Sequence, residues 1–293
     1  MQRWIWRNIS LELPKEWELL LFSKKRKAGS LTFADRKKYR LQLAWRELSG
    51  QPDIPRMARD YAAQLLAKDD QSRPQAERVA GWWAIGHRSE GMSSTRYVRF
   101  FIEQNLLVEA IAPPTPLARD GRISEEVLES VNLETHHEDG LDEWSAFGML
   151  WQAPGCWELT SAQVQPASVT LEFAPEKEKG MYDRVTRRGM VRHWLKGSVA
   201  EWLKLQIPSN AERVVEATLE SEGVKRWSVS GQVKPSSWGQ GAQGWRKFSA
   251  LAWICPGDGR LFCHQRMEGM KEAPPEGSLW SWARSPVKEF AYV

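Results

Sequence analysis

Alternating hydrophobic and polar positions run through most of the chain and predict β-strands. The pattern is strictest from Tyr39 to Trp45, where bulky side chains alternate with polar or small ones. A period of two residues is typical of a strand that buries one face. The sequence therefore predicts antiparallel sheets.

Two segments depart from this alternation and predict helices. After Pro52-Asp53, apolar residues recur at helical spacing at Met57, Tyr61 and Leu65. This spacing predicts a helix of about 13 residues. Ser198 is a favourable N-cap for a second, shorter helix. Each half of the chain thus has the same predicted order of strands, one helix and further strands.

The amino-acid sequence itself also repeats when it is shifted by 140 positions. Residues 4–34 contain eight identities with residues 144–174, where about two are expected by chance. The block Ala76–Val79 matches Ala211–Val214 at a shift of 135, and a coincidence remains the alternative. The eight matches are Trp4/Trp144, Pro14/Pro154, Trp17/Trp157, Glu18/Glu158, Leu19/Leu159, Leu31/Leu171, Phe33/Phe173 and Ala34/Ala174.

The repeat predicts an α+β fold that arose by internal duplication. We expect two tandem modules, each an antiparallel sheet with one covering helix. The N-terminal module comprises residues 1–112 and the C-terminal module residues 144–293, which ends in a Trp-rich tail. Residues 113–143 are Pro-rich at their start and then acidic, with a net charge of −8 over residues 120–145. They are predicted to be a linker.

A short motif at the start of each half resembles a known group of α+β proteins. The motif reads Leu13-Pro14-Lys15-Glu16-Trp17-Glu18 in the first half and Ala153-Pro154-Gly155-Cys156-Trp157-Glu158 in the second. Each half is similar to one PsbP-like module over about 110 residues. The resemblance implies a non-catalytic binding scaffold, and it carries no functional residue over to this chain.

Composition excludes several classes of protein. The 293 residues carry a net charge of +4 and are 42% hydrophobic, which is ordinary for a globular chain and excludes a disordered or collagen-like one. No apolar run approaches the roughly 18 residues of a membrane-spanning helix. Cys255 and Cys263 are predicted on opposite faces of one hairpin, so we expect free thiols. With no secretion signal at the N-terminus, this favours a cytoplasmic protein.

Candidate catalytic and cofactor motifs do not fit their expected surroundings. Gly239–Gly244 matches G-x-G-x-x-G, but a strand follows it where a dinucleotide site needs a helix. His136-His137-Glu138-Asp139 places two histidines next to each other, which point apart in a strand. We therefore predict no cofactor, no metal and no catalytic residue. An enzyme with a site between the modules, around His87, His193 or His264, stays an alternative.

Basic side chains are concentrated near the N-terminus. Residues 1–60 have 14 basic and 7 acidic residues, and two clusters fall at predicted strand ends, where we expect them to lie close together. Such clusters can contact phosphates, an acidic partner or the acidic linker, and lysines also protect edge strands. The clusters are Lys24, Lys25, Arg26 and Lys27, and Arg36, Lys37 and Lys38.

Tryptophan is unusually frequent, with 17 residues. Seven of these residues lie among periodic apolar positions and are predicted to be core: Trp17, Trp45, Trp83, Trp157, Trp202, Trp227 and Trp253. Four others lie in Gly/Ser-rich or terminal segments and are candidates for a protein interface, because tryptophan is enriched at binding hot spots. These four are Trp238, Trp245, Trp280 and Trp282.

Together these observations favour a non-enzymatic binding or assembly protein that presents two related sheet surfaces to a protein partner. The predicted contacts are the two basic clusters and the four exposed tryptophans. A nucleic-acid-binding module that uses the basic loops and stacking aromatics is the first alternative. The enzyme described above is the second alternative.

Overall fold

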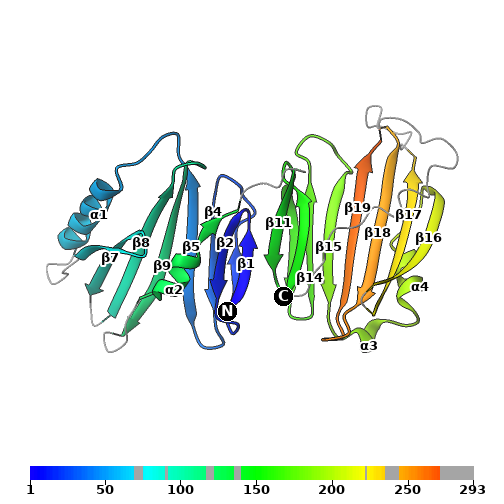
Figure 1. Ribbon diagram of the computed structural model, residues 1–293, viewed down its shortest axis with the longest axis horizontal. Coiled ribbons are helices and arrows are strands. Elements are labelled where there is room, and N and C mark those ends of the chain that lie inside the picture. The colour runs from blue at the N-terminus through cyan, green and yellow to red at the C-terminus, as the bar shows by residue number, and fades with distance from the viewer. Residues whose placement is uncertain are drawn as a thin grey trace. The chain divides into compact units, whose positions relative to one another are not determined.

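The chain folds predominantly as β-sheet. A computed structural model describes residues 1–68, 75–89, 92–116, 122–134, 140–221, 223–234 and 244–270. Strands make up 57% of the structure and helices 12%. Contacts divide the chain into two compact units, with the boundary between Leu150 and Trp151. Figure 1 shows the strands and helices of each unit.

The first unit contains a seven-stranded antiparallel sheet with the order β3-β4-β5-β9-β8-β7-β6. Helix α1 (Ile54–Lys68) follows β5 and lies against β7 and β8 (Figure 1). Its Ile54 packs with Val98 and Leu107 on this face. The strands are β3 (Glu18–Phe22), β4 (Ala28–Ala34), β5 (Tyr39–Glu47), β6 (Gln75–Val79), β7 (Trp82–Ser89), β8 (Met92–Phe101) and β9 (Leu106–Pro116).

The second unit contains a seven-stranded sheet with the order β13-β14-β15-β19-β18-β17-β16. Two short helices follow β15, α3 (Val191–Trp194) and α4 (Val199–Lys204). Ser198 caps α4 in a capping box with Glu201, as its sequence position predicts. The strands are β13 (Glu158–Gln165), β14 (Ser168–Ala174), β15 (Tyr182–Arg188), β16 (Ala211–Ser221), β17 (Val224–Val233), β18 (Arg246–Ile254) and β19 (Leu261–Gly269).

The two seven-stranded sheets have the same strand order and a matching register. Neighbouring residues across five strands of the first sheet form the row Ser30, Ala44, Glu109, Val98 and Trp83. In the second sheet, the row that starts 140 positions later is Thr170, Thr186, Cys263, Ala252 and Trp227. Both rows end on a tryptophan, so equivalent positions can be assigned across both sheets.

Strands also cover the face of each large sheet that lies opposite the helix. In the first unit the Trp4 ring meets the edge of Phe33 at 5.3 Å between centroids, and in the second Trp151 lies 6.1 Å from Phe173. Trp4 lies on β1 (Gln2–Trp6), which pairs with β2 (Ile9–Leu13) and β11 (Leu141–Ala146), and β2 also pairs with β10 (Asn132–Leu133). Trp151 lies on β12 (Met149–Pro154).

The predicted α+β class is wrong, and helix-covered PsbP-like modules are not supported. Among the described residues of the second unit only ten are helical, in α3 and α4, which is too few to cover a seven-stranded sheet. Strand-borne tryptophans cover the opposite apolar face in both units. Helix α1 is confirmed, but its predicted apolar stripe is only partly right, because Met57 is exposed and the buried positions are Ile54 and Ala58. Packing of strands on sheets contributes most of the core.

Part of the predicted linker contributes to the first unit. Helix α2 (Glu125–Ser130) buries Val127 and Leu128, and the Trp82 indole N–H donates to the Leu128 carbonyl at 3.0 Å. Glu134 forms an ion pair with Arg3 at 2.7 Å, so at least one acid of this stretch meets the basic N-terminal region.

Two further expectations can be compared with the strand register. Glu77 pairs with Ala84 near the β6–β7 turn, whereas Glu212 pairs with Gln232 at the far end of its hairpin. The Ala76–Val79 match therefore does not join equivalent positions. Cys263 pairs with Ala252 in the β18–β19 hairpin, and the expectation that Cys255 and Cys263 are free thiols is confirmed; Cys156 is free as well.

The matching cores give a first prediction. Phe33 is fully buried at a position equivalent to the fully buried Phe173. We expect Phe33→Ala to lower the free energy of unfolding by about 3–5 kcal/mol, because the change leaves a cavity. Urea denaturation followed by circular dichroism measures it. Thr32→Ala, on the opposite face of the same strand, is the control and should cost well under half as much; equal losses would contradict this packing.

Candidate functional site

The two predicted basic clusters form turns at opposite ends of β4. Lys24–Lys27 connects β3 to β4, and Arg36–Lys38 connects β4 to β5. The seven residues of β4 separate them by about 20 Å, at roughly 3.3 Å per residue. The expectation that the clusters lie close together is therefore wrong, and each turn is a separate basic surface.

Hydrogen bonds to the first unit fix the backbone of the Lys24–Lys27 turn. The Arg7 guanidinium donates to the Lys24 carbonyl, and the Trp45 indole N–H donates to the Arg26 carbonyl at 2.9 Å. All four side chains of the turn are exposed. An ordered backbone therefore presents four cationic side chains to solvent.

The Arg36–Lys38 turn is organised around Asp35. Its carboxylate accepts the backbone N–H groups of Lys37 and Lys38, both at 2.8 Å, and pairs with the Arg40 guanidinium. The Arg40 hydrogen bond, followed by the two backbone hydrogen bonds, lowers the pKa of Asp35 to about 2. Because Asp35 is ionised at neutral pH and paired, this turn is less cationic than the first.

The strand beside the Lys24–Lys27 turn exposes two large apolar side chains. β3 is an edge strand, and the side chains of Leu20 and Leu21 are 50% and 59% exposed. A bulge between Leu19 and Leu21 interrupts the regular pairing of β3 with β4. The equivalent edge strand of the second sheet has a bulge at the same place but carries Thr160 and Ser161. The fold therefore does not require leucine at these positions.

The remaining predicted contact and ligand residues are only partly described. Trp245 is half-buried, and its carbonyl accepts a hydrogen bond from the Met270 N–H at 2.8 Å. Trp238, Trp280 and Trp282 lie outside the described residues, as do His136–Asp139 and all of the Gly239–Gly244 motif except Gly244.

The three histidines considered for catalysis are not seen to form a site. His193 is exposed on α3, His264 is buried in β19, and the side chain of His87 lies outside the described part of the structure. Within the described ranges, no three His, Cys, Asp or Glu side chains are grouped so that they could bind a metal ion. None of the described helices is both long and apolar enough to cross a membrane.

A buried charged cluster in the second sheet was not predicted. Asp183 is fully buried; its Oδ1 lies 2.5 Å from His264 Nε2, and its Oδ2 accepts from Arg266 Nε at 2.8 Å. Burial alone would raise the pKa of Asp183, but attraction and hydrogen bonding from His264 and Arg266 outweigh it, and the pKa is lowered. The carboxylate is therefore ionised and internally satisfied, which fits a structural role.

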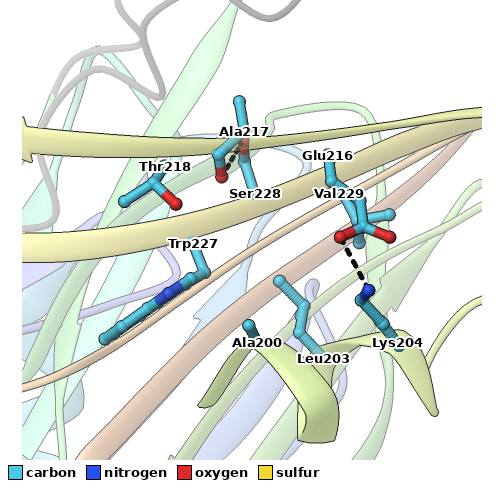
Figure 2. A pocket seen from close by; sticks show the side chains of 9 residues that line it. All are labelled: Ala200, Leu203, Lys204, Glu216, Ala217, Thr218, Trp227, Ser228 and Val229. Atoms are coloured by element: carbon cyan, nitrogen blue, oxygen red, sulfur yellow. Dashed lines mark hydrogen bonds and ion pairs between the residues drawn. The ribbon is translucent and has the colours of Figure 1, made fainter. Parts of the chain in front are cut away.

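Helix α4 lines two hollows over the second sheet. The smaller, of about 210 Å³, lies between α4 and strands β16 and β17. Figure 2 shows the Trp227 indole along one side of it and the ion pair of Lys204 with Glu216, at 2.9 Å, at the other. This ion pair neutralises the two charged side chains of the smaller hollow, and its other polar side chains are the hydroxyls of Thr218 and Ser228.

The larger hollow, of about 340 Å³, lies over strands β13, β14, β15 and β19. Glu172 accepts two hydrogen bonds from Arg184, from Nε at 2.8 Å and from Nη2 at 2.5 Å. Arg184 Nη1 also donates to Gln265 Oε1 at 3.3 Å. Its lining residues are Ser161, Gln163, Thr170, Glu172, Arg184, Thr186, Arg188, Trp202, Gln206, Cys263 and Gln265.

The sequence shows the polar positions that line this hollow, but not the strand pairing that brings them together. Thr170 and Glu172 alternate with buried residues on β14, and Arg184 and Thr186 do so on β15. Alternation alone does not distinguish a solvated polar face from one that lines a hollow. Their convergence depends on β19, which is about 80 residues away in the sequence and pairs with β15.

Comparisons with known proteins do not identify the chain. No family model and no curated protein match it. A solved structure from Bacteroides thetaiotaomicron VPI-5482 matches at 16% identity over 49% of this chain and 50% of that chain, with a TM-score of 0.28. The apo structure of immunity protein TplEi of T6SS from Pseudomonas aeruginosa matches at 7% identity over 96% and 92%, with a TM-score of 0.34. Scores this low do not establish a shared fold.

The buried cluster predicts a pH-dependent stability. The depressed pKa of Asp183 means that its ionised form stabilises the fold above about pH 4, the ordinary value for an unfolded chain, and that this contribution is lost as the pH falls. We expect Asp183→Asn to cost about 3 kcal/mol at pH 7, because it leaves the partners of a buried ion pair unbalanced.

Urea denaturation at pH 7 and pH 3 measures both effects. The difference in the free energy of unfolding between the native protein and Asp183→Asn should be smaller at pH 3 than at pH 7. Asp258→Asn, at an exposed turn, is the control and should cost no more than about 0.5 kcal/mol. If this difference in the free energy of unfolding is the same at both pH values, the charge of Asp183 is not what stabilises the fold.

Proposed function

We propose that the chain is a binding protein that docks an acidic protein partner on the β3 edge of the first unit. The observation that carries this proposal is the pair of exposed leucines, Leu20 and Leu21, beside the cationic Lys24–Lys27 turn. Exposed apolar side chains next to like charges match a partner with an apolar contact flanked by carboxylates.

The bulge in β3 favours docking through side chains. A regular edge strand can recruit an added strand from a partner through its backbone, but a bulge disrupts that ladder. Leu20 and Leu21 lie at this irregularity. The contact is therefore one of apolar side chains at the bulge and charge pairing at the turn.

A protein partner fits these residues better than a nucleic acid. Single-stranded nucleic acids gain affinity from aromatic rings that stack on bases, and leucine side chains cannot provide this. The first unit places Leu20 and Leu21, and no ring, at the most exposed positions of β3. A cytoplasmic location belongs to this proposal, and the three free cysteines support it.

Affinity capture from the source cells tests the proposal with matched variants. Leu20→Thr combined with Leu21→Ser introduces the residues that the second sheet carries at the equivalent positions, so the fold should tolerate them. We expect this variant, and separately Lys24→Glu with Lys25→Glu, to retain an acidic partner at least tenfold less than the native chain does, a change of about 1.4 kcal/mol. Quantitative mass spectrometry measures the retained protein.

Leu219→Thr is the control, since Leu219 is also exposed on an edge strand, β16. A protein that this control retains and both variants lose supports the proposal. Equal capture by all four chains, or a nuclease-sensitive oligonucleotide as the retained species, overturns it.

A further inference from the structure

We propose that the larger hollow of the second unit binds a sugar that carries a carboxylate, as a free monosaccharide or as the end of a glycan chain. This site is separate from the β3 edge and does not depend on it. The volume, about 340 Å³, is at the lower end of the range for ligand sites, roughly 300–1,000 Å³. It therefore suits a small molecule or a chain terminus.

The floor of the hollow is held in place by a connected network of hydrogen bonds. Glu172 binds Arg184 through two N–H groups, Arg184 reaches Gln265, and Gln265 Nε2 lies 3.5 Å from Gln206 Oε1. The guanidinium of Arg184 also lies over the Tyr182 ring at 4.7 Å. Polar groups that are already ordered lose little entropy when a ligand binds.

The first sheet shows that the fold does not need this network. By the matched register, the positions of Glu172, Arg184 and Gln265 correspond to Thr32, Gln42 and Ile111. That triplet is uncharged and includes an isoleucine. The charged triplet of the second unit therefore needs an explanation other than sheet formation.

The mixture of donors and acceptors suits hydroxyl groups. A hydroxyl both donates and accepts, so it can bind the free lone pairs of Glu172 and also the side chains of Ser161, Gln163 and Gln206. A fully ionised phosphate only accepts hydrogen bonds, so it cannot donate to the Glu172 carboxylate as a sugar hydroxyl can. The floor therefore favours a polyhydroxylated ligand over a nucleotide.

Two further side chains select an acidic sugar. Trp202 contributes an aromatic wall against which the apolar face of a sugar ring can pack. Arg188 stacks on Trp194 at 4.9 Å, and no ion pair joins it to a carboxylate in the described ranges. Its guanidinium is available for a charge-assisted hydrogen bond with a ligand carboxylate.

Isothermal titration of the full chain tests this site with D-glucuronate, D-glucose and a disaccharide that ends in glucuronate. We expect either glucuronate ligand to bind, and glucose to bind at least tenfold more weakly. At about 10 mM sugar, even a site with a Kd of about 1 mM is mostly filled. Tighter binding of the disaccharide than of D-glucuronate would identify the end of a glycan chain as the ligand. Equal binding of the two would identify the free sugar, and either result supports the site.

Variants locate the binding. Arg188→Gln should remove the preference for glucuronate over glucose, and Arg184→Gln should weaken both at least tenfold. Gln163→Ala, on the edge strand β13, should weaken sugar binding less, and it leaves the hydrogen bonds of the floor intact. Gln42→Ala, at the position in the first sheet equivalent to Arg184, is the control and should change nothing. No heat with any sugar, or binding that these hollow variants leave intact, overturns the proposal.

Discussion

The structure depends on covering the apolar face that each seven-stranded sheet creates. Strand alternation places Leu31 and Phe33 on one face of β4, and Leu171 and Phe173 on the same face of β14. That face is buried under strand-borne tryptophans, Trp4 in one unit and Trp151 in the other. Since sheets stack with their side chains interleaved, this contact leaves no choice of register for β4 or β14. The residues on the opposite face of each sheet are not constrained by this contact, so they can differ between the two units.

The opposite face is where the two units diverge. In both units the helices lie mainly over the strands at one end of the sheet, β6–β8 in the first and β17 and β18 in the second, and away from the edge strands β3 and β13. The first unit carries leucines at this end, Leu20 and Leu21, whereas the second carries hydrogen-bonding side chains around Glu172 and Arg184. Residues that packing does not constrain are the ones that can acquire a binding role, which is why we look for function there.

Local patterns in the sequence predicted local structure well. The alternation from Tyr39 to Trp45 is a strand, the stripe around Met57 is a helix, and Ser198 caps α4. The α+β class was wrong, because a hydrophobic period does not reveal what covers a sheet. Of the seven tryptophans predicted to be core, Trp45 and Trp253 are buried and the other five are only partly buried. Among these five, Trp83 and Trp227 lie on the sheet face that bears the helices. The hollow could not be predicted because it depends on the pairing of β15 with β19, a contact between distant segments.

The buried charges of the second sheet connect its core to its open face. Asp183 and His264 occupy the positions that Leu41 and Ala110 hold in the first sheet, so an apolar pair is compatible with the fold there. A buried ion pair is weak evidence for stability, but it can fix how two strands are aligned. Arg184 follows Asp183 and Gln265 follows His264, and successive side chains of a strand point to opposite faces. The cluster thus joins β15 to β19 directly behind Arg184 and Gln265, the two residues of these strands that form the floor of the hollow.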